Sequence, residues 1–448
     1  MRIVPLALLA GVAVLTACSM IPSWMGGSKK EAEKKLEGQR IAVLRGAIPL
    51  EPDSALATVP ADTPAAVANP SWSQHAGGAA GRPDVPNPAL AVSLEKRQSA
   101  RVGDGNDFSY KLVTPPVVGD GAVFAMDANG MVSAHDVKDV SEVRWISPGV
   151  ASEKSEAVVG GGLAYESGRV YAASGKGLVV GLNAATGVEL WRQMLNIPIR
   201  SAPRVSSGRV YVTTVDSQLF ALDAGTGIIV WSHRGVDEGH GFLIEPSPAV
   251  TGELVVAPYA SGEIHGLRPE SGEEVWNDGV VGVQRQSATA LFTGIGGDPV
   301  ITPDGLLYVA GSANQFAVFQ AETGRRLWDQ PISSLNTPQV VGDYVYVLNT
   351  DAALVCLHRT DGRVKWVASL PEFEDMEKKK NRYTWNGPVM AGGRLLVAGA
   401  HGKMMEISPQ DGSVLATTEI PEGVYAPPVV AQGVLYLVTS DAKLYALY

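Results

Sequence analysis

The chain has 448 residues, of which 45% are apolar and 18% are charged, and its formal net charge is −10. This acidic balance argues against a nucleic-acid partner, because binding to phosphates needs a basic face. Only two cysteines are present, which argues against a disulfide framework and excludes a zinc site built from thiolates.

The N-terminus has the pattern of a secretory signal followed by a lipid anchor. Residues 1–17 combine Arg2 with an apolar stretch, as signal peptides do. Small residues then precede Cys18 in the sequence LTAC, which matches the bacterial lipobox. We therefore expect Cys18 to be acylated and to hold the protein on the periplasmic face of the outer membrane. The alternative is an ordinary signal peptide in which the cysteine is accidental.

Residues 18–71 are predicted to be a lipidated tether and linker. Residues 29–44 suit either a short charged helix or a solvated segment. Residues 45–71 are rich in Ala, Pro and Asp without periodicity, which is typical of a flexible coil. The folded domain is accordingly predicted to span residues 72–448.

From residue 112 onward, one pattern of apolar strands and glycine turns recurs eight times. The copies are expected at 116–136, 163–183, 203–223, 248–268, 299–320, 338–358, 388–408 and 428–448, each followed by a further strand in all but the last. A repeat of this length with four short strands per copy is typical of propeller blades. The sequence therefore predicts an all-β fold, an eight-bladed β-propeller.

The fourth strand of most copies contains a tryptophan, and in five of them it lies four residues after a glycine. The tryptophans are Trp145, Trp191, Trp231, Trp276, Trp328 and Trp366. The glycine can adopt the positive φ that a tight turn needs. We expect each indole to lie on the outer strand and to fill the wedge between two blades.

A small residue recurs six positions before that glycine, for example at Gly181, Ala221 and Cys356. We interpret it as a response to crowding near the central channel. Cys356 is therefore predicted to be a small apolar core residue without a redox role.

Copy eight has only three strands, because the sequence reaches Tyr448 directly after the third. An open ring would expose sheet edges. We expect residues 88–98 to pair with 443–448 and to close the ring.

The motif (A/G)-L-(D/N)-x-x-T-G-x-x-x-W resembles the pyrroloquinoline-quinone-type propeller repeat. Together with the lipobox and the segment Trp72–Gly78 (WSQHAGG), it makes the chain similar to the BamB family of lipoproteins in the outer-membrane β-barrel assembly (BAM) complex. The resemblance implies docking on the POTRA domains of BamA, association with other BAM lipoproteins, and help in inserting nascent outer-membrane β-barrel proteins.

In that family the docking patch lies on the loops after the third and fourth blade tryptophans, here residues 232–247 and 277–298. The resemblance implies partner contacts on these loops at Phe242, Leu243, Ile244, Glu245, Arg285 and Asp298. Phe242 to Ile244 would be an exposed apolar triplet with a charged rim. Glu245 stands where the family has an arginine. The alternative is that the triplet caps the third blade.

No residue pattern indicates catalysis, a cofactor or a metal. The sequence lacks a phosphate-binding loop and a His-Glu-x-x-His motif, and His233 and His240 share a loop without further ligands. One rival is a pyrroloquinoline-quinone-dependent quinoprotein dehydrogenase. Such enzymes typically carry adjacent cysteines, whereas Cys356 is the one cysteine beyond the anchor. A second rival is a propeller that binds envelope glycans.

Overall fold

The computed structural model describes residues 50–95, 97–106, 112–151, 160–237, 245–280 and 294–448. Contacts divide the chain into residues 1–46 and 47–448, and all described residues belong to the second unit. Within them the one helix is α1 (Ser54–Ala57). This part of the chain holds no helix with the length and hydropathy of a membrane span. Cys18 lies outside the described residues.

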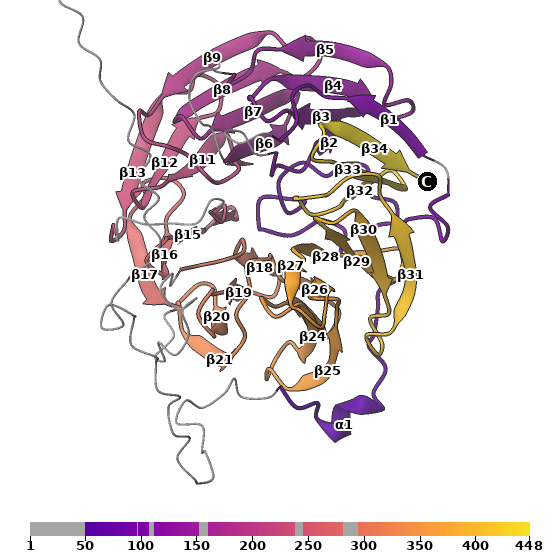
Figure 1. Ribbon diagram of the computed structural model, residues 1–448. Coiled ribbons are helices and arrows are strands. Elements are labelled where there is room, and N and C mark those ends of the chain that lie inside the picture. The colour runs from indigo at the N-terminus through magenta and orange to yellow at the C-terminus, as the bar shows by residue number, and fades with distance from the viewer. Residues whose placement is uncertain (1–49, 96, 107–111, 152–159, 238–244, 281–293) are drawn as a thin grey trace, which may run out of the picture. The chain divides into compact units, whose positions relative to one another are not determined.

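The second unit is an eight-bladed β-propeller, as predicted, and each blade is a four-stranded antiparallel sheet (Figure 1). Blades one to four are β2 (Val117–Gly119), β3 (Ala122–Met126), β4 (Val132–Asp136) and β5 (Val143–Ser147); β6 (Gly161–Glu166), β7 (Arg169–Ser174), β8 (Leu178–Asn183) and β9 (Glu189–Met194); β10 (Arg204–Ser206), β11 (Arg209–Thr214), β12 (Gln218–Asp223) and β13 (Ile229–Arg234); and β14 (Ala249–Val250), β15 (Val255–Pro258), β16 (Glu263–Leu267) and β17 (Glu274–Gly279).

Blades five to eight are β18 (Val300–Ile301), β19 (Leu306–Ala310), β20 (Phe316–Gln320) and β21 (Arg326–Gln330); β22 (Gln339–Val341), β23 (Tyr344–Leu348), β24 (Ala353–His358) and β25 (Val364–Ser369); β28 (Trp385–Ala391), β29 (Arg394–Gly399), β30 (Lys403–Ile407) and β31 (Val414–Glu419); and β32 (Val429–Ala431), β33 (Val434–Val438) and β34 (Lys443–Leu447), completed by β1 (Arg97–Arg101). The first strands of neighbouring blades contact one another, as β2 does with β6 and β10 with β14, so they line the centre.

An N-terminal strand closes the ring, which confirms the predicted closure. Strand β1 pairs antiparallel with β34, so that Arg97 lies opposite Leu447 and Arg101 opposite Lys443. The pairing strand begins later than the predicted segment 88–98. The preceding residues are held elsewhere, because Pro88 accepts a backbone hydrogen bond from Gly392 of blade seven.

Each blade tryptophan lies on an outer strand and links its blade to the next one. The indole Nε1–H donates to a backbone carbonyl of the following blade: Trp145 to Ala184 (2.9 Å), Trp191 to Ala224 (3.0 Å), Trp231 to Pro269 (2.8 Å), Trp276 to Ala321 (2.8 Å), Trp328 to Arg359 (3.1 Å) and Trp366 to Pro409 (3.0 Å). The glycine of the next turn lies against this ring. At Gly272, which has φ +73°, a Cβ atom would be 2.5 Å from Cε3 of Trp231. The motif therefore needs glycine both for backbone conformation and for space.

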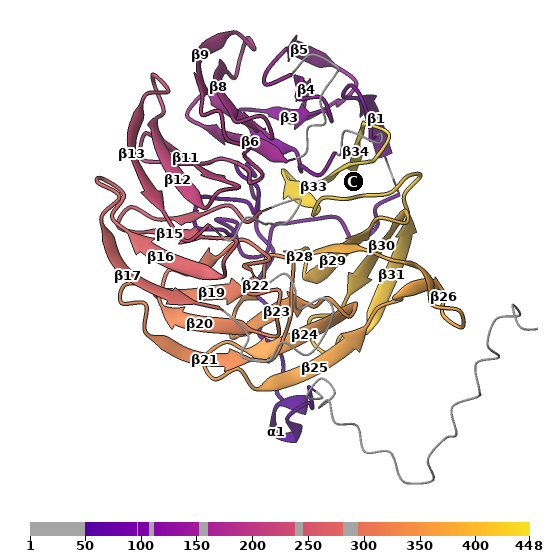
Figure 2. The same cartoon turned by 60° about the vertical axis from the view of Figure 1, so that its left-hand side comes forward.

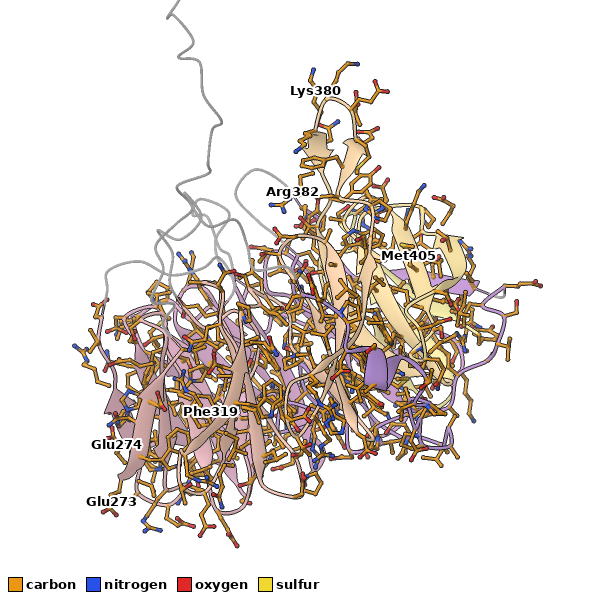
Figure 3. The ribbon with its side chains drawn as sticks, turned by 90° about the horizontal axis from the view of Figure 1, so that it is seen from below. Glu273, Glu274, Phe319, Lys380, Arg382 and Met405 are labelled. Carbon is orange, nitrogen blue, oxygen red and sulfur yellow. The ribbon has the colours of Figure 1, made fainter. Side chains whose placement is uncertain are left out.

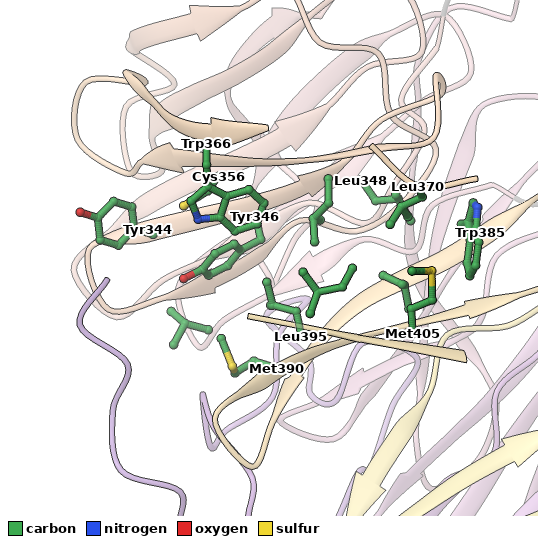
Figure 4. Packing of buried hydrophobic residues seen from close by; sticks show 14 of the residues in the cluster. Tyr344, Tyr346, Leu348, Cys356, Trp366, Leu370, Trp385, Met390, Leu395 and Met405 are labelled. Carbon is green, nitrogen blue, oxygen red and sulfur yellow. The ribbon is translucent and has the colours of Figure 1, made fainter. Parts of the chain in front are cut away.

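The recurrent small residue lies on the third strand, opposite the tryptophan of its own blade. Gly181 pairs with Trp191, and a Cβ atom there would be 2.5 Å from the indole nitrogen. The predicted cause, crowding near the central channel, is therefore wrong, because the indole itself occupies the space. Cys356 lies opposite Trp366 in the core between blades six and seven (Figure 4). Burial raises the pKa of its thiol, which supports the predicted core role.

The prediction of a flexible linker is wrong for residues 50–71, because this segment packs on the propeller. Next to α1, the amide of Asp53 donates to Val364 (2.7 Å), and Nζ of Lys365 donates to the carbonyl of Leu56 (2.9 Å). Leu56 is buried, as is Ala61. The backbone of this Pro- and Ala-rich segment is thus satisfied by blades that are distant in sequence, which its composition does not reveal.

Residues 69–80 continue along the inner strands and link successive blades. The hydrogen bonds run from Gln432 to Asn69 (2.7 Å), Val118 to Trp72 (2.8 Å), Tyr165 to Ser73 (2.7 Å), Val250 to Ala79 (2.7 Å) and Ile301 to Ala80 (2.9 Å), each from backbone amide to backbone carbonyl. The side chain of Gln74 bonds the amide (3.0 Å) and the carbonyl (2.7 Å) of Val205. This one segment therefore ties blade eight and blades one to five together at the centre.

The strand order gives the propeller two distinct faces. We call the connection face the one where the last strand of a blade continues into the next blade. The opposite face, the turn face, carries the turns that join the first and second strands and the third and fourth strands. A hairpin of β26 (Phe373–Asp375) and β27 (Lys380–Arg382) interrupts the connection between blades six and seven. It projects from the body (Figure 2), with Lys380 near its tip (Figure 3).

Candidate partner-docking site

The two loops predicted for docking are neighbours on the connection face. One joins β13 to β14 and the other joins β17 to β18, so they leave adjacent blades. Their C-terminal ends meet, because the backbone amide of Ser247 donates to Oδ1 of Asp298 (2.7 Å). Phe242, Leu243, Ile244 and Arg285 lie outside the described residues.

Asp298 is buried at the C-terminal end of the second loop, with 3% of its side chain exposed. Its Oδ2 atom accepts from Nη2 of Arg204 (2.5 Å) and contacts Nδ1 of His75 (2.7 Å). Burial alone would raise the pKa of this carboxyl, but His75 and Arg204 outweigh it and hold the pKa below its usual value. The prediction of Asp298 as an exposed rim contact is therefore wrong, because the carboxylate neutralises a buried arginine.

Arg204 is fully buried, and its hydrogen bonds connect several segments of the chain. Its Nε–H donates to the carbonyl of Pro248 (2.9 Å) and its Nη1–H donates to that of Gly78 (3.0 Å). One guanidinium thus links the N-terminal segment, the start of blade three, and the residues that lead into blades four and five. Such a joint fixes the ends of both loops where they enter blades four and five.

Glu245 is also buried, with a relative exposure of 5%. Burial raises the pKa of its carboxyl from 4.5 to about 7. Its Oε1 atom accepts no hydrogen bond among the described residues. Glu245 is therefore not an exposed partner contact either. Its burial leaves no mark in the sequence, because a glutamate in a loop is normally solvated.

At the bases of the loops, an exposed apolar side chain is accompanied by charge pairs that are mostly only partly exposed. Val236 follows β13 and is 53% exposed. Arg234 pairs with Asp216 (3.1 Å) at the start of the first loop, and Arg326 pairs with Asp278 (3.0 Å) at the start of the second. Apolar surface with a polar rim is the usual make-up of a protein–protein interface.

A cluster of possible metal ligands, which no sequence motif indicates, lies between blades three and four. His233 comes from β13, His265 from β16 and Glu274 from β17, and one ligand atom of each lies within 4.8 Å of the other two. Burial lowers the pKa of His233, while hydrogen bonds from Asn277 and His265 lower that of Glu274. The three residues come from three different strands of two blades, so no local spacing marks them.

These features define a class: an eight-bladed propeller whose blades are joined by tryptophan–glycine contacts and which presents neighbouring loops on one face. The family model described as "Outer membrane protein assembly factor BamB" matches residues 142–368 and 374–448. The chain therefore belongs to the BamB family of outer-membrane protein assembly factors.

Individual proteins agree with this assignment. The chain is 28% identical to the outer membrane protein assembly factor BamB of Salmonella typhimurium over 353 residues, which are 78% of this chain and 87% of the relative. The crystal structure of BamB from Moraxella catarrhalis superposes with a TM-score of 0.65 at 21% identity, covering 78% of this chain and 98% of that one.

The same fold also occurs in enzymes. A europium-containing methanol dehydrogenase superposes with a TM-score of 0.62 at 14% identity, covering 84% of this chain and 89% of that one. At this identity the likeness shows a common propeller architecture and nothing of its chemistry.

Proposed function

We propose that this chain is a lipid-anchored, non-enzymatic scaffold of the BAM complex at the periplasmic face of the outer membrane. It docks on the POTRA domains of BamA, beside other BAM lipoproteins, and aids insertion of nascent outer-membrane β-barrel proteins. Family membership together with two neighbouring loops on one face is the observation that supports this role.

The rigid support under these loops suits a docking role. Arg204 and Asp298 fix the ends of both loops, and Trp231 fixes blade three to blade four. Fixed loop ends reduce the conformational entropy that is lost when a partner binds the loops. The contacts are proposed at Phe242, Leu243, Ile244 and Arg285, whereas Asp298 and Glu245 support the loops from beneath.

The arrangement of the centre supports a role without catalysis. In a quinoprotein of this fold, the quinone would bind on the propeller axis. Here residues 72–80 form hydrogen bonds with backbone groups of the inner strands of blades one to five. The chain's own N-terminal segment thus occupies backbone hydrogen-bonding groups of these inner strands that would otherwise be open to a ligand.

Co-purification tests the docking site. The double variant Leu243→Asp, Ile244→Asp should lose BamA from mildly solubilised outer membranes, because two charges would enter an apolar contact. Val188→Asp is a matched control, since Val188 is 60% exposed in a turn of blade two on the turn face. Undiminished BamA recovery with the double variant would remove the docking assignment.

The anchor is tested separately. Cys18→Ser should release the protein from the membrane fraction, because no acyl chain could be attached. Membrane retention of this variant at the wild-type level would contradict lipidation at Cys18.

A further inference from the structure

Blade three and blade four meet at a side-chain cluster that has no counterpart at the other blade interfaces within the described residues. His233 lies two residues after Trp231, so both side chains leave β13 on the face that meets blade four. On β16, Gly266 lies under the ring of Trp276, which faces blade five. Because side chains alternate along a strand, the preceding residue His265 faces blade three. The positions equivalent to His265 in the flanking copies are Phe220 and Ala317.

The ring of His233 directs its Nε2 atom at the cluster. Its Nδ1 atom is 2.8 Å from the hydroxyl of Tyr259, which donates in turn to the carbonyl of His233 (3.4 Å). When Nδ1 carries the proton and donates to this hydroxyl, Nε2 offers its lone pair to a cation. Nε2 faces Oε2 of Glu274 at 3.4 Å.

His265 brings a second imidazole to the same carboxylate. Its Nδ1 atom lies 2.7 Å from Oε2 of Glu274. The residue is only 8% exposed, and its Nε2 atom has no hydrogen-bond partner among the described residues. A carboxylate oxygen of Glu263 lies 3.8 Å from Nε2, too far for a hydrogen bond. This buried polar atom needs an explanation, because an unsatisfied group costs stability.

We propose that His233 Nε2, His265 Nδ1 and Glu274 Oε2 bind a divalent cation of the zinc class, which cross-links blades three and four. Two imidazoles and a carboxylate are ligands that zinc prefers, at about 2.0–2.2 Å each, which sets tetrahedral ligand atoms roughly 3.4 Å apart. The spacing between His233 and Glu274 already has this value. The contact between His265 and Glu274, now 2.7 Å, must open by about 0.7 Å, as expected when a metal replaces a hydrogen bond.

Both histidines have the outer partners that metal-bound histidines use. Tyr259 holds Nδ1 of His233, and Glu263 faces Nε2 of His265. Once Nδ1 binds the metal, Nε2 carries the proton, and an approach of Glu263 from 3.8 Å to hydrogen-bonding distance would satisfy the unpaired atom. Hydrogen bonds of this kind orient the ring and increase its basicity.

The site is also connected by a hydrogen bond to the start of the first docking loop. The carboxylate of Glu263 accepts a hydrogen bond from the backbone amide of Val236 (2.9 Å), two residues beyond the end of β13. A cation would therefore fix β13 to blade four just below that loop. The assignment of the metal site rests on blade geometry and does not depend on the proposed partner.

Zinc binding by the full-length chain tests the site. The protein is purified in mild detergent without a polyhistidine tag, treated with chelator, supplied with zinc chloride and desalted, and its zinc is measured by mass spectrometry. We expect one zinc per chain. Glu274→Gln should weaken binding by at least roughly tenfold, the effect known for even an outer-shell partner. Because Glu274 is 36% exposed, this variant should fold, and circular dichroism checks it.

His358→Gln is the matched control, because His358 also contacts a carboxylate, Asp361 (2.9 Å), but belongs to no three-ligand cluster among the described residues. It should bind zinc as wild type does. Cobalt(II) gives a second readout: the wild-type chain should show the visible absorption of a tetrahedral site, and His233→Gln should lose it. Absence of stoichiometric zinc in the wild type, or equal zinc in Glu274→Gln and His358→Gln, would overturn the proposal.

Discussion

The effects of substituting Trp231 and Gly272 on the free energy of unfolding should be coupled, because the indole ring leaves no space for a side chain at position 272. Gly272→Ala would place a methyl group 2.5 Å from Cε3 of Trp231 at a backbone φ of +73°. The positive φ costs about 1–2 kcal/mol for an L-residue, and overpacking costs about 1–3 kcal/mol more. Gly208→Ala isolates the first cost, since Gly208 has φ +76° and a methyl group there would meet no atom within 4 Å.

Removal of the ring should relieve the second cost. Trp231→Ala alone is expected to destabilise by about 3–5 kcal/mol, because it leaves a cavity and removes the hydrogen bond to Pro269. In the double variant, Gly272→Ala has no ring to displace. The double variant should therefore be more stable, by about 1–3 kcal/mol, than the sum of the single changes predicts.

Urea unfolding followed by far-ultraviolet circular dichroism measures all four members of this cycle and the Gly208→Ala control. Additivity within about 0.5 kcal/mol would refute the coupling. An equal cost for Gly208→Ala and Gly272→Ala would likewise show that backbone conformation alone selects glycine in the motif.

Three further predictions concern the loop supports and the closure. The pKa of Glu245 is raised to about 7, so the folded state retains its proton longer than the unfolded state and stability falls as pH rises from about 4.5 through 7. Glu245→Gln should therefore stabilise the protein by about 3 kcal/mol at pH 8 and hardly at pH 4, as measured by urea unfolding at both values. Asp298→Asn should destabilise by about 3–5 kcal/mol at neutral pH, because Arg204 is left buried without its partner; a cost below about 1 kcal/mol would contradict the buried pair. Deletion of residues 97–101 should abolish a single cooperative unfolding transition, since β34 loses its neighbour; calorimetry showing an unchanged transition would disprove closure by β1.

The repeat pattern is sufficient to predict the fold. Regular spacing of glycine and tryptophan is a local signal, so the number of blades, the outer position of Trp231 and the need for a closing strand all follow from it. The cause of the small residue at Gly181 does not follow, because the pairing of the third and fourth strands decides which side chains face each other. The closing strand begins later than expected because residues 88–92 have partners of their own in blades seven and eight.

The site is less predictable, because its parts come from distant segments. Nothing near Asp298 in the chain signals its burial, since its partners Arg204 and His75 are 94 and 223 positions away. The sequence does not reveal the cluster around His265 either, because its three residues lie on three strands of two blades. The residue pattern along one strand does not show which side chains contact each other across a blade interface. The networks of Asp298 and His265 both consist of contacts between distant segments.

Photo-crosslinking from defined positions on the two faces shows whether the connection face near blades three and four binds BamA. A photoreactive residue replaces Val236 on that face or Val188 on the turn face, both of which are more than half exposed. The protein is crosslinked in intact envelopes and its adducts are identified by mass spectrometry. We predict POTRA-domain adducts of BamA from position 236 and none from position 188. Adducts from position 188 alone, or no BamA adduct from position 236, would contradict docking through the connection face.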